Sequence, residues 1–83
     1  MSREVIFYTR KQCGLCDEAL AELRALRDDL RFDLREQDID ADPSLRARFT
    51  DVIPVVAVGD RVIAQAPIDP ASLRARLESA LSP

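Results

Sequence analysis

The chain has 83 residues, of which 47% are hydrophobic and 33% are charged. This length supports one hydrophobic core, and the apolar content is too high for an intrinsically disordered chain, so we expect one domain over residues 1–83. The apolar runs at residues 5–8 and 55–58 are far shorter than the roughly 18 residues of a membrane helix. The start of the chain lacks the basic and long apolar segments of a secretory signal. We therefore expect a cytoplasmic protein without a membrane partner.

The charged residues and the absence of His restrict the functions that this chain can have. Twelve basic and 15 acidic side chains give a net charge of −3, whereas a nucleic-acid binder needs a basic surface to neutralise phosphate. With no His in the chain, triads and metal sites built on imidazole are excluded. The two cysteines become the chemical focus. In a cytoplasmic protein such a pair is more often redox-active or metal-binding than a structural disulfide.

The N-terminal part of the chain predicts a strand followed by a helix. Residues 4–9 contain a continuous apolar run, which is typical of a central strand covered on both faces. Across residues 14–30 apolar side chains recur at spacings of three and four, from Cys16 through Leu23 to Leu30. This periodicity predicts an amphipathic helix.

The middle of the chain predicts an edge strand and a second helix. Phe32 and Leu34 alternate with charged residues, as in a half-exposed strand at the edge of a sheet. The alternation is lost at residues 36–38. Asp42-Pro43 then supplies an N-cap acceptor followed by a residue suited to the first helical position, so a helix should start there.

The C-terminal part predicts a hairpin and a third helix. Residues 54–58 and 61–65 are apolar stretches separated by Gly59-Asp60, a two-residue turn in which Gly supplies a positive φ. Asp69-Pro70 repeats the helix-start signal of the second helix. The predicted element order of the domain is therefore βαβαββα.

The most informative motif is Cys13-Gly14-Leu15-Cys16, which falls where the first strand passes into the first helix. If Cys13 is the N-cap, its sulfur faces the unpaired N–H groups of the first helical turn. Those groups, together with the helix dipole, favour the thiolate, so we expect Cys13 to ionise more readily than a free cysteine and to act as the nucleophile. Cys16 lies one turn further along the apolar face and should resolve the mixed disulfide that Cys13 forms.

Two other interpretations of the cysteine pair stay open. Cys16 fits an inert, buried cysteine, although Cys13 lies outside the apolar stripe. A CxxC pair can also supply half of a zinc or cluster site, but the sequence offers no second Cys pair and no His to complete one. We therefore expect no metal ligands in this chain and favour a redox dithiol.

Residues 6–16, with the sequence IFYTRKQCGLC, carry a family resemblance. The order of aromatic, hydroxyl and basic residues before CxxC resembles the thioredoxin superfamily, and the chain looks most like a short bacterial glutaredoxin-like protein. The resemblance implies an α/β, thioredoxin-like fold with a four-stranded mixed sheet of order 2-1-3-4 flanked by helices. It also implies a cis bond between Ile53 and Pro54, with the Ile53 backbone free to pair with an extended substrate. Arg10, with Lys11 beside it, takes the place of the family's basic residue near the active site.

The same resemblance implies a dithiol–disulfide oxidoreductase that serves cell redox homeostasis. Its partners would be a disulfide-containing protein or a small thiol substrate, and either a thioredoxin reductase or glutathione as the reductant. We expect a monomer with no bound cofactor. Glutathione remains an alternative co-substrate, although glutathione-using members carry a Thr before the cis proline and a Gly-Gly pair where this chain has residues 51–54 and 64–67.

Two rival functions follow from the same motif. The first is a glutathione-dependent glutaredoxin that acts through Cys13 alone. The second is a thioredoxin-fold binding module or cluster carrier whose dithiol does not turn over.

Overall fold

A single four-stranded sheet organises the domain. The computed structural model describes residues 3–82. Its elements are β1 (Glu4–Thr9), α1 (Gly14–Leu30), β2 (Asp33–Asp38), the 3-10 helix η1 (Ile39–Ala41), α2 (Pro43–Phe49), β3 (Val55–Val58), β4 (Arg61–Gln65) and α3 (Pro70–Leu81). The strand order is β2-β1-β3-β4. β1 is parallel to β2 and antiparallel to β3, and β3 is antiparallel to β4. These pairings confirm the predicted mixed sheet of order 2-1-3-4.

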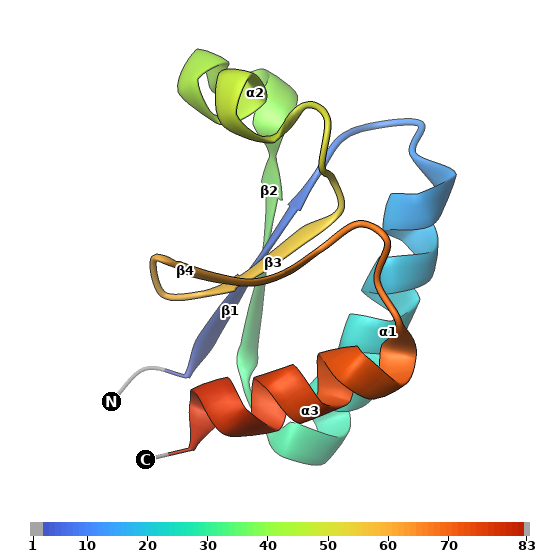
Figure 1. Ribbon diagram of the computed structural model, residues 1–83, viewed down its shortest axis with the longest axis vertical. Coiled ribbons are helices and arrows are strands. Elements are labelled where there is room, and N and C mark those ends of the chain that lie inside the picture. Colours follow the sequence, from blue (N-terminus) through green and yellow to red (C-terminus); the bar gives the residue numbers. More distant parts are fainter. Residues whose placement is uncertain (1–2, 83) are drawn as a thin grey trace.

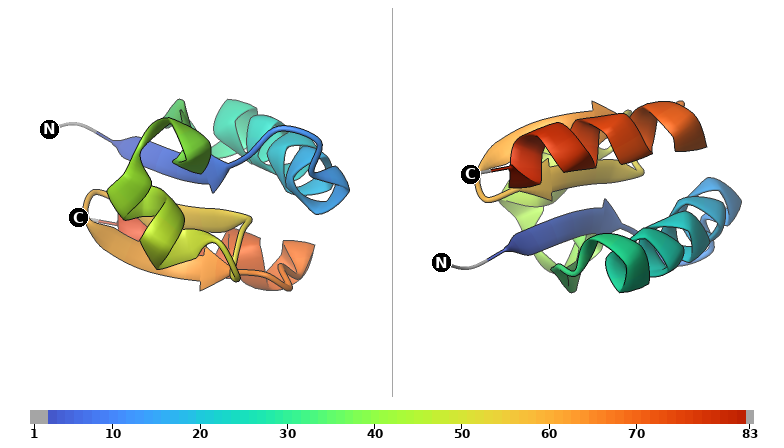
Figure 2. Two further views of the ribbon diagram at one scale, coloured as in Figure 1. Left: turned by 90° about the horizontal axis from the view of Figure 1, so that it is seen from above. Right: turned by 90° about the horizontal axis from the view of Figure 1, so that it is seen from below.

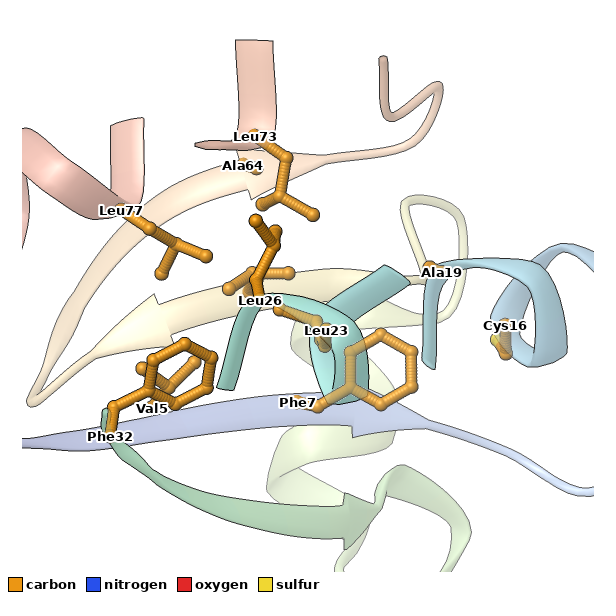
Figure 3. Close-up of a cluster of buried hydrophobic side chains, with 11 residues drawn as sticks. Val5, Phe7, Cys16, Ala19, Leu23, Leu26, Phe32, Ala64, Leu73 and Leu77 are labelled. Atoms are coloured by element: carbon orange, nitrogen blue, oxygen red, sulfur yellow. The ribbon is translucent and has the colours of Figure 1, made fainter. Parts of the chain in front are cut away.

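The helices cover the two faces of the sheet unequally. Relative to the view of Figure 1, Figure 2 shows α2 in front of the sheet when the molecule is seen from above, and α1 and α3 in front of it when it is seen from below. The larger core cluster joins α1 and α3 to one face of the sheet, with Phe7, Leu23 and Leu77 fully buried at its centre (Figure 3). A smaller cluster around Ile39 and Phe49 covers part of the opposite face.

The central strand β1 is only partly as predicted. Val5 and Phe7 are 0% exposed, but Ile6 and Tyr8 on the opposite face are half-buried. The expected cover on both faces is therefore found, but it is less complete on the second face. The reason is that α2 has only seven residues and packs over the end of the strand where Tyr8 stacks on Phe49, with ring centroids 4.5 Å apart.

The helix starts and the hairpin turn follow the local signals in the sequence. Asp42 accepts a hydrogen bond from the Ser44 N–H at 2.9 Å, and Asp69 accepts one from the Ser72 N–H at 3.0 Å. Each Asp is an N-cap that satisfies an N–H with no partner inside its helix. Gly59 in the β3–β4 turn has a φ of 62°, the left-handed conformation that glycine adopts without steric cost.

Strand β2 extends further than the sequence pattern indicates. It continues through Asp38, which pairs with Thr9 at the last position of the parallel β1–β2 ladder. Polar residues are tolerated at 36–38 because this is an edge strand, in which Glu36 is exposed and Gln37 and Asp38 are half-buried, while hydrogen bonds to β1 keep its backbone extended. The loss of alternation at residues 36–38 therefore does not end the strand, and the expected edge position is confirmed.

The two ends of the sheet carry different features. Cys13 follows the C-terminal end of β1, whereas the β3–β4 turn lies at the opposite end, since Val58 pairs with Val5. At that opposite end Arg3 and Ser82 line one surface depression. Within residues 3–82 the helices are all too short or too polar to cross a membrane.

Candidate active site

The cysteine pair lies at the start of α1, as its position in the sequence predicts. Cys13 is the N-cap, with extended backbone angles of φ −117° and ψ 102°. Its sulfur accepts a hydrogen bond from the Cys16 N–H, with 3.2 Å between donor and acceptor. The two sulfur atoms are paired as a disulfide, and the Cα atoms are 5.2 Å apart. One cysteine sulfur therefore occupies the position of a helix cap and also contacts the other cysteine.

The two cysteines differ in their access to solvent. Cys16 is 2% exposed and belongs to the main core cluster, at one edge of the group in Figure 3. Cys13 is half-buried and packs against the same cluster. Between them Leu15 is 63% exposed. A molecule that approaches from solvent therefore reaches the Cys13 sulfur before that of Cys16.

The loop before β3 packs against the same core cluster as the cysteines. The Ile53-Pro54 peptide bond is cis, which confirms the expectation from the family resemblance. Pro54 is buried, and Ile53 packs against the same core cluster as Cys13. The Ala66-Pro67 bond is also cis, which is not expected from the sequence.

The backbone of Ile53 is less free than expected. Its N–H donates to the Phe49 carbonyl at 3.2 Å, at the end of α2. Because a residue has one backbone donor and one acceptor, only the Ile53 carbonyl oxygen is left for a partner. Pairing of the Ile53 backbone with an extended substrate therefore stays a prediction, and it concerns the carbonyl oxygen.

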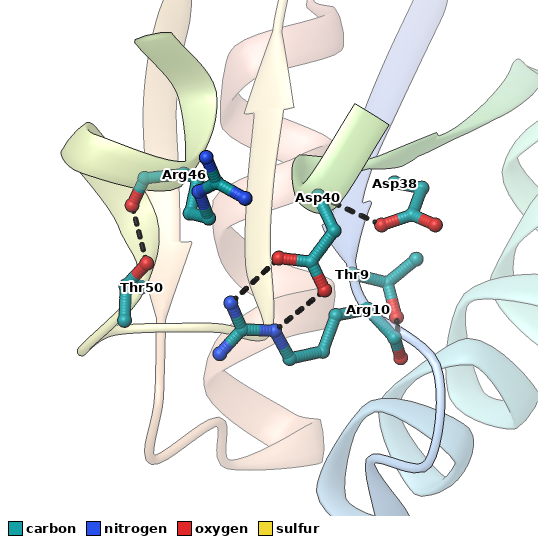
Figure 4. Close-up of polar contacts among 6 residues, drawn as sticks. All are labelled: Thr9, Arg10, Asp38, Asp40, Arg46 and Thr50. Carbon is teal, nitrogen blue, oxygen red and sulfur yellow. Dashed lines mark hydrogen bonds and ion pairs between the residues drawn. The ribbon is translucent and has the colours of Figure 1, made fainter. Parts of the chain in front are cut away.

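Arg10 is held by an acidic residue 30 positions further along the chain. Its Nε and a terminal nitrogen donate to the two carboxylate oxygens of Asp40, at 3.1 and 2.8 Å (Figure 4). Asp40 is oriented in turn, because its N–H donates to the Asp38 carboxylate at 2.8 Å. The hydrogen bonds from Arg10 hold the pKa of Asp40 below its usual value. These two hydrogen bonds between Arg10 and Asp40, which we call the fork, join the loop before Cys13 to η1.

The position of Arg10 changes the role expected of it. Its charge is matched by Asp40 in a two-point contact, so Arg10 is not a free cation for a substrate carboxylate. Lys11 is exposed and forms no ion pair with any residue from 3 to 82. Of the two basic residues that the sequence singles out, Lys11 is the one without an ion pair within residues 3–82, and binding of substrate by either residue stays a prediction. Arg10 instead fixes the loop that leads to Cys13.

We predict a pH-dependent contribution of this fork to stability. Because the pKa of Asp40 is lowered in the folded state, the ion pair stabilises the fold above the unfolded-state pKa and is lost as the pH falls through the folded-state pKa. Asp40→Asn should therefore lower the free energy of unfolding at neutral pH, and the difference from the wild type should vanish in acid. Urea denaturation across the acid range measures it.

Asp51→Asn is the matched control for this prediction. Asp51 is exposed and forms no ion pair within the described chain, so its removal should leave the pH profile unchanged. A profile for Asp40→Asn that parallels the wild type at every pH would contradict the stabilising role of the fork.

A groove opens beside the disulfide. It has a volume of about 540 Å³ and runs between α1 and the loop from β4 to α3. Figure 1 shows this loop next to the first half of α1. Leu15 and Ala19 line it from α1, Pro67 and Ile68 from the loop, and Pro54 from the start of β3. Both cis prolines therefore contribute to one apolar surface next to the cysteine motif. Sequence reasoning missed this groove, because its walls are distant in the sequence.

The part of the chain that the structure describes holds no group of three or more His, Cys, Asp or Glu side chains placed to bind a metal ion. The chemistry that the arrangement offers is that of the two sulfur atoms. A pair of cysteines at disulfide distance, with one sulfur facing helix N–H groups, can take up and release two electrons as a dithiol and a disulfide.

Comparison with known proteins agrees with this geometry. The sequence model of the Glutaredoxin-like domain (DUF836) matches residues 4–78. The chain belongs to the glutaredoxin-like domain family. The uncharacterized protein Rv0508 of Mycobacterium tuberculosis (strain ATCC 25618 / H37Rv) is 36% identical over 81 residues, which cover 90% of this chain and 84% of that protein. The glutaredoxin-like match spans both cysteines and all four strands.

Solved structures place this glutaredoxin-like domain within the thioredoxin fold. Protein XcR50 from X. campestris superposes with a TM-score of 0.77 at 29% sequence identity, covering 95% of this chain and 99% of that one. Thioredoxin 1 from Thermosipho africanus gives a TM-score of 0.70 at 16% identity, over 94% and 93% of the two chains. The second likeness concerns the fold alone. Together they confirm the predicted thioredoxin-like architecture.

Proposed function

We propose that this glutaredoxin-like domain is a dithiol–disulfide oxidoreductase in which Cys13 attacks and Cys16 resolves. The observation that carries the proposal is the hydrogen bond from the Cys16 N–H to the Cys13 sulfur at the N-terminus of α1. In the reduced protein this donor and the helix dipole would favour a thiolate at Cys13. The greater exposure of Cys13 than of Cys16 supports the same assignment.

The proposed reaction transfers two electrons in two exchange steps. The Cys13 thiolate attacks one sulfur of a substrate disulfide, a mixed disulfide forms, and the other substrate sulfur leaves as a thiolate. Cys16, as its thiolate, then attacks the Cys13 sulfur, and the second substrate thiolate is released. The substrate is reduced by two electrons and the protein is left with the Cys13–Cys16 disulfide, the pairing present in the structure. A dithiol or thiol reductant restores the reduced protein.

We also propose that protein disulfides, rather than glutathione mixed disulfides, are the principal substrates. Among the residues that line the groove within the described chain there is no Lys or Arg, and Arg10 is bound by Asp40. Lys11 is left to attract carboxylates, and an exposed ion pair contributes little binding energy. A thioredoxin reductase is the reductant that fits this preference. Cytoplasmic reducing conditions would keep such a dithiol available for redox homeostasis.

The proposed function is tested by comparing two reductant systems. Reduced protein should reduce a protein disulfide directly, and turnover should be sustained by thioredoxin reductase with NADPH. Turnover of hydroxyethyl disulfide, coupled through glutathione to glutathione reductase, should be slower. Consumption of NADPH measures both rates.

The outcome that would overturn the dithiol assignment is specific. Fast turnover in the glutathione-coupled assay, lost in Cys13→Ser but retained in Cys16→Ser, would show a glutathione-dependent mechanism that uses Cys13 alone. Failure of the wild-type protein in both assays would favour a binding module whose disulfide does not turn over.

A further inference from the structure

We infer that the groove beside the disulfide selects protein segments in which an apolar side chain adjoins the reactive cysteine and a Lys or Arg lies about three residues from that cysteine. The inference rests on the proposed function, because it names the substrate class that the dithiol would reduce. It assigns the choice of substrate to Leu15, Glu18 and Glu22 on α1.

The end of the groove nearest the cysteines is apolar. Leu15 lies between the two cysteines in the sequence and is 63% exposed, although burial of such a side chain is favourable. Ile68 faces the same groove from the β4–α3 loop, and Ala19 and Pro54 are buried beneath it. The volume of about 540 Å³ falls within the range of pockets that enclose sizeable ligands. An apolar side chain next to a substrate cysteine would cover Leu15.

The rim of the groove is acidic further along α1. Glu18 and Glu22 both line the groove, and both are exposed. They follow Leu15 by three and seven positions, which places all three residues on one side of a helix. Neither Glu forms an ion pair with another residue among positions 3–82. These two carboxylates are therefore available to a cation carried by the occupant.

The spacing along the helix fixes the spacing expected in the partner. Glu22 lies seven residues beyond Leu15, which corresponds to about 10 Å at a rise of roughly 1.5 Å per residue. An extended peptide advances about 3.3 Å per residue, so it covers that length in about three residues. Glu18, three residues beyond Leu15, lies only about 4.5 Å along the helix. A substrate segment with its apolar residue over Leu15 thus brings the side chain two positions further on, three residues from the cysteine, between Glu18 and Glu22.

Glutathione fits this surface poorly. It is a tripeptide with a net charge of −1: its glycyl end carries a carboxylate alone, and at its γ-glutamyl end the ammonium group is offset by a neighbouring carboxylate. Neither end therefore offers Glu18 and Glu22 a cation without a carboxylate beside it. A longer segment with Lys or Arg replaces that repulsion by attraction. Complementary charge of this kind raises the rate of productive encounter, and salt screens it.

The test uses reduced protein and synthetic peptides whose single cysteine is held in a disulfide with 2-nitro-5-thiobenzoate. Each peptide carries Leu next to Cys and either Lys or Glu three residues from Cys, in both chain directions. Release of the coloured thiolate gives the second-order rate constant. The charged residue stands either before or after Cys in the peptide. At low ionic strength we expect, for at least one of these two arrangements, the Lys peptide to react about five- to tenfold faster than the matching Glu peptide. The ratio should fall as salt is added.

Matched charge variants locate the source of the preference. The double variant Glu18→Gln/Glu22→Gln should bring the Lys-to-Glu ratio close to one while both peptides still react. Asp33→Asn/Asp60→Asn removes the same charge at the opposite end of the sheet and should keep the wild-type ratio. Leu15→Ser should slow the reaction of the peptide with Leu next to Cys more than the reaction of a peptide with Ser at that peptide position.

Three results would overturn the inference. Equal rates for Lys and Glu peptides in the wild-type protein would show that the groove does not read charge. A preference that survives in Glu18→Gln/Glu22→Gln would assign it to other residues. Absence of reaction with every peptide would overturn the proposed function itself, which separates that failure from a failure of the groove alone.

Discussion

Cys16→Ser is expected to trap the protein as a stable mixed disulfide through Cys13, whereas Cys13→Ser should lower the rate of disulfide reduction by at least about a thousandfold. The reason is the order of access, since Cys13 is half-buried at the helix N-terminus and Cys16 is 2% exposed. Without the Cys16 sulfur, the adduct at Cys13 has no neighbouring thiolate to resolve it. Intact-protein mass spectrometry after exposure to a substrate disulfide detects the adduct.

The two variants are controls for each other. Each replaces one cysteine by Ser and removes the same disulfide, so a loss of stability from the missing cross-link affects both. Thermal unfolding of each variant confirms that a folded domain is compared. An adduct that forms as fast on Cys16 of the Cys13→Ser protein would reverse the assignment of nucleophile and resolving cysteine.

Leu23→Ala is expected to lower the free energy of unfolding by about 2–5 kcal/mol. Leu23 is 0% exposed and belongs to the main core cluster, so its truncation leaves a cavity that the neighbours cannot fill. For a domain of this size the loss corresponds to a fall in Tm of at least about 10 °C. Urea denaturation and thermal unfolding measure the two quantities.

The same substitution elsewhere on α1 provides the comparison. Leu15→Ala removes the same atoms from the same helix, but Leu15 is 63% exposed, so we expect a change within about 0.5 kcal/mol. Similar losses in the free energy of unfolding for both variants would contradict the difference in burial between Leu15 and Leu23. A stable Leu15→Ala protein also indicates that substitutions at this position affect the groove without unfolding the domain.

Features set by neighbouring residues could be predicted from the sequence. Cys13 caps α1 because a side-chain acceptor precedes the helical run, and Asp42 and Asp69 cap the next two helices for the same reason. Gly59 gives the positive φ of the hairpin. Each of these signals extends over a few residues, so it does not depend on the rest of the fold.

Features set by contacts between distant segments could not be predicted. The pairing of Arg10 with Asp40 joins residues 30 positions apart, and neither residue type specifies the other. Asp38 belongs to a strand because of its partner in β1, not because of its own neighbours. The Ile53 N–H is bound by the end of α2, which a resemblance to relatives does not specify.

The site was therefore predicted only in part. Its cysteines and the cis bond before Pro54 follow from the motif and the family resemblance. The groove, by contrast, exists only once the β4–α3 loop lies against α1. The sequence alone therefore does not show that Glu22 and Ile68 line the same groove.

Arg3 and Ser82 line one surface depression, so attachments at these two positions start from the same region of the domain. The chain enters β1 and leaves α3 on the side of the sheet remote from Cys13. A fused neighbour, an affinity handle or a surface tether at either position projects away from the disulfide and leaves the approach to it open. The Gly59-Asp60 turn lies at the same remote end, so it offers a third attachment point with the same property.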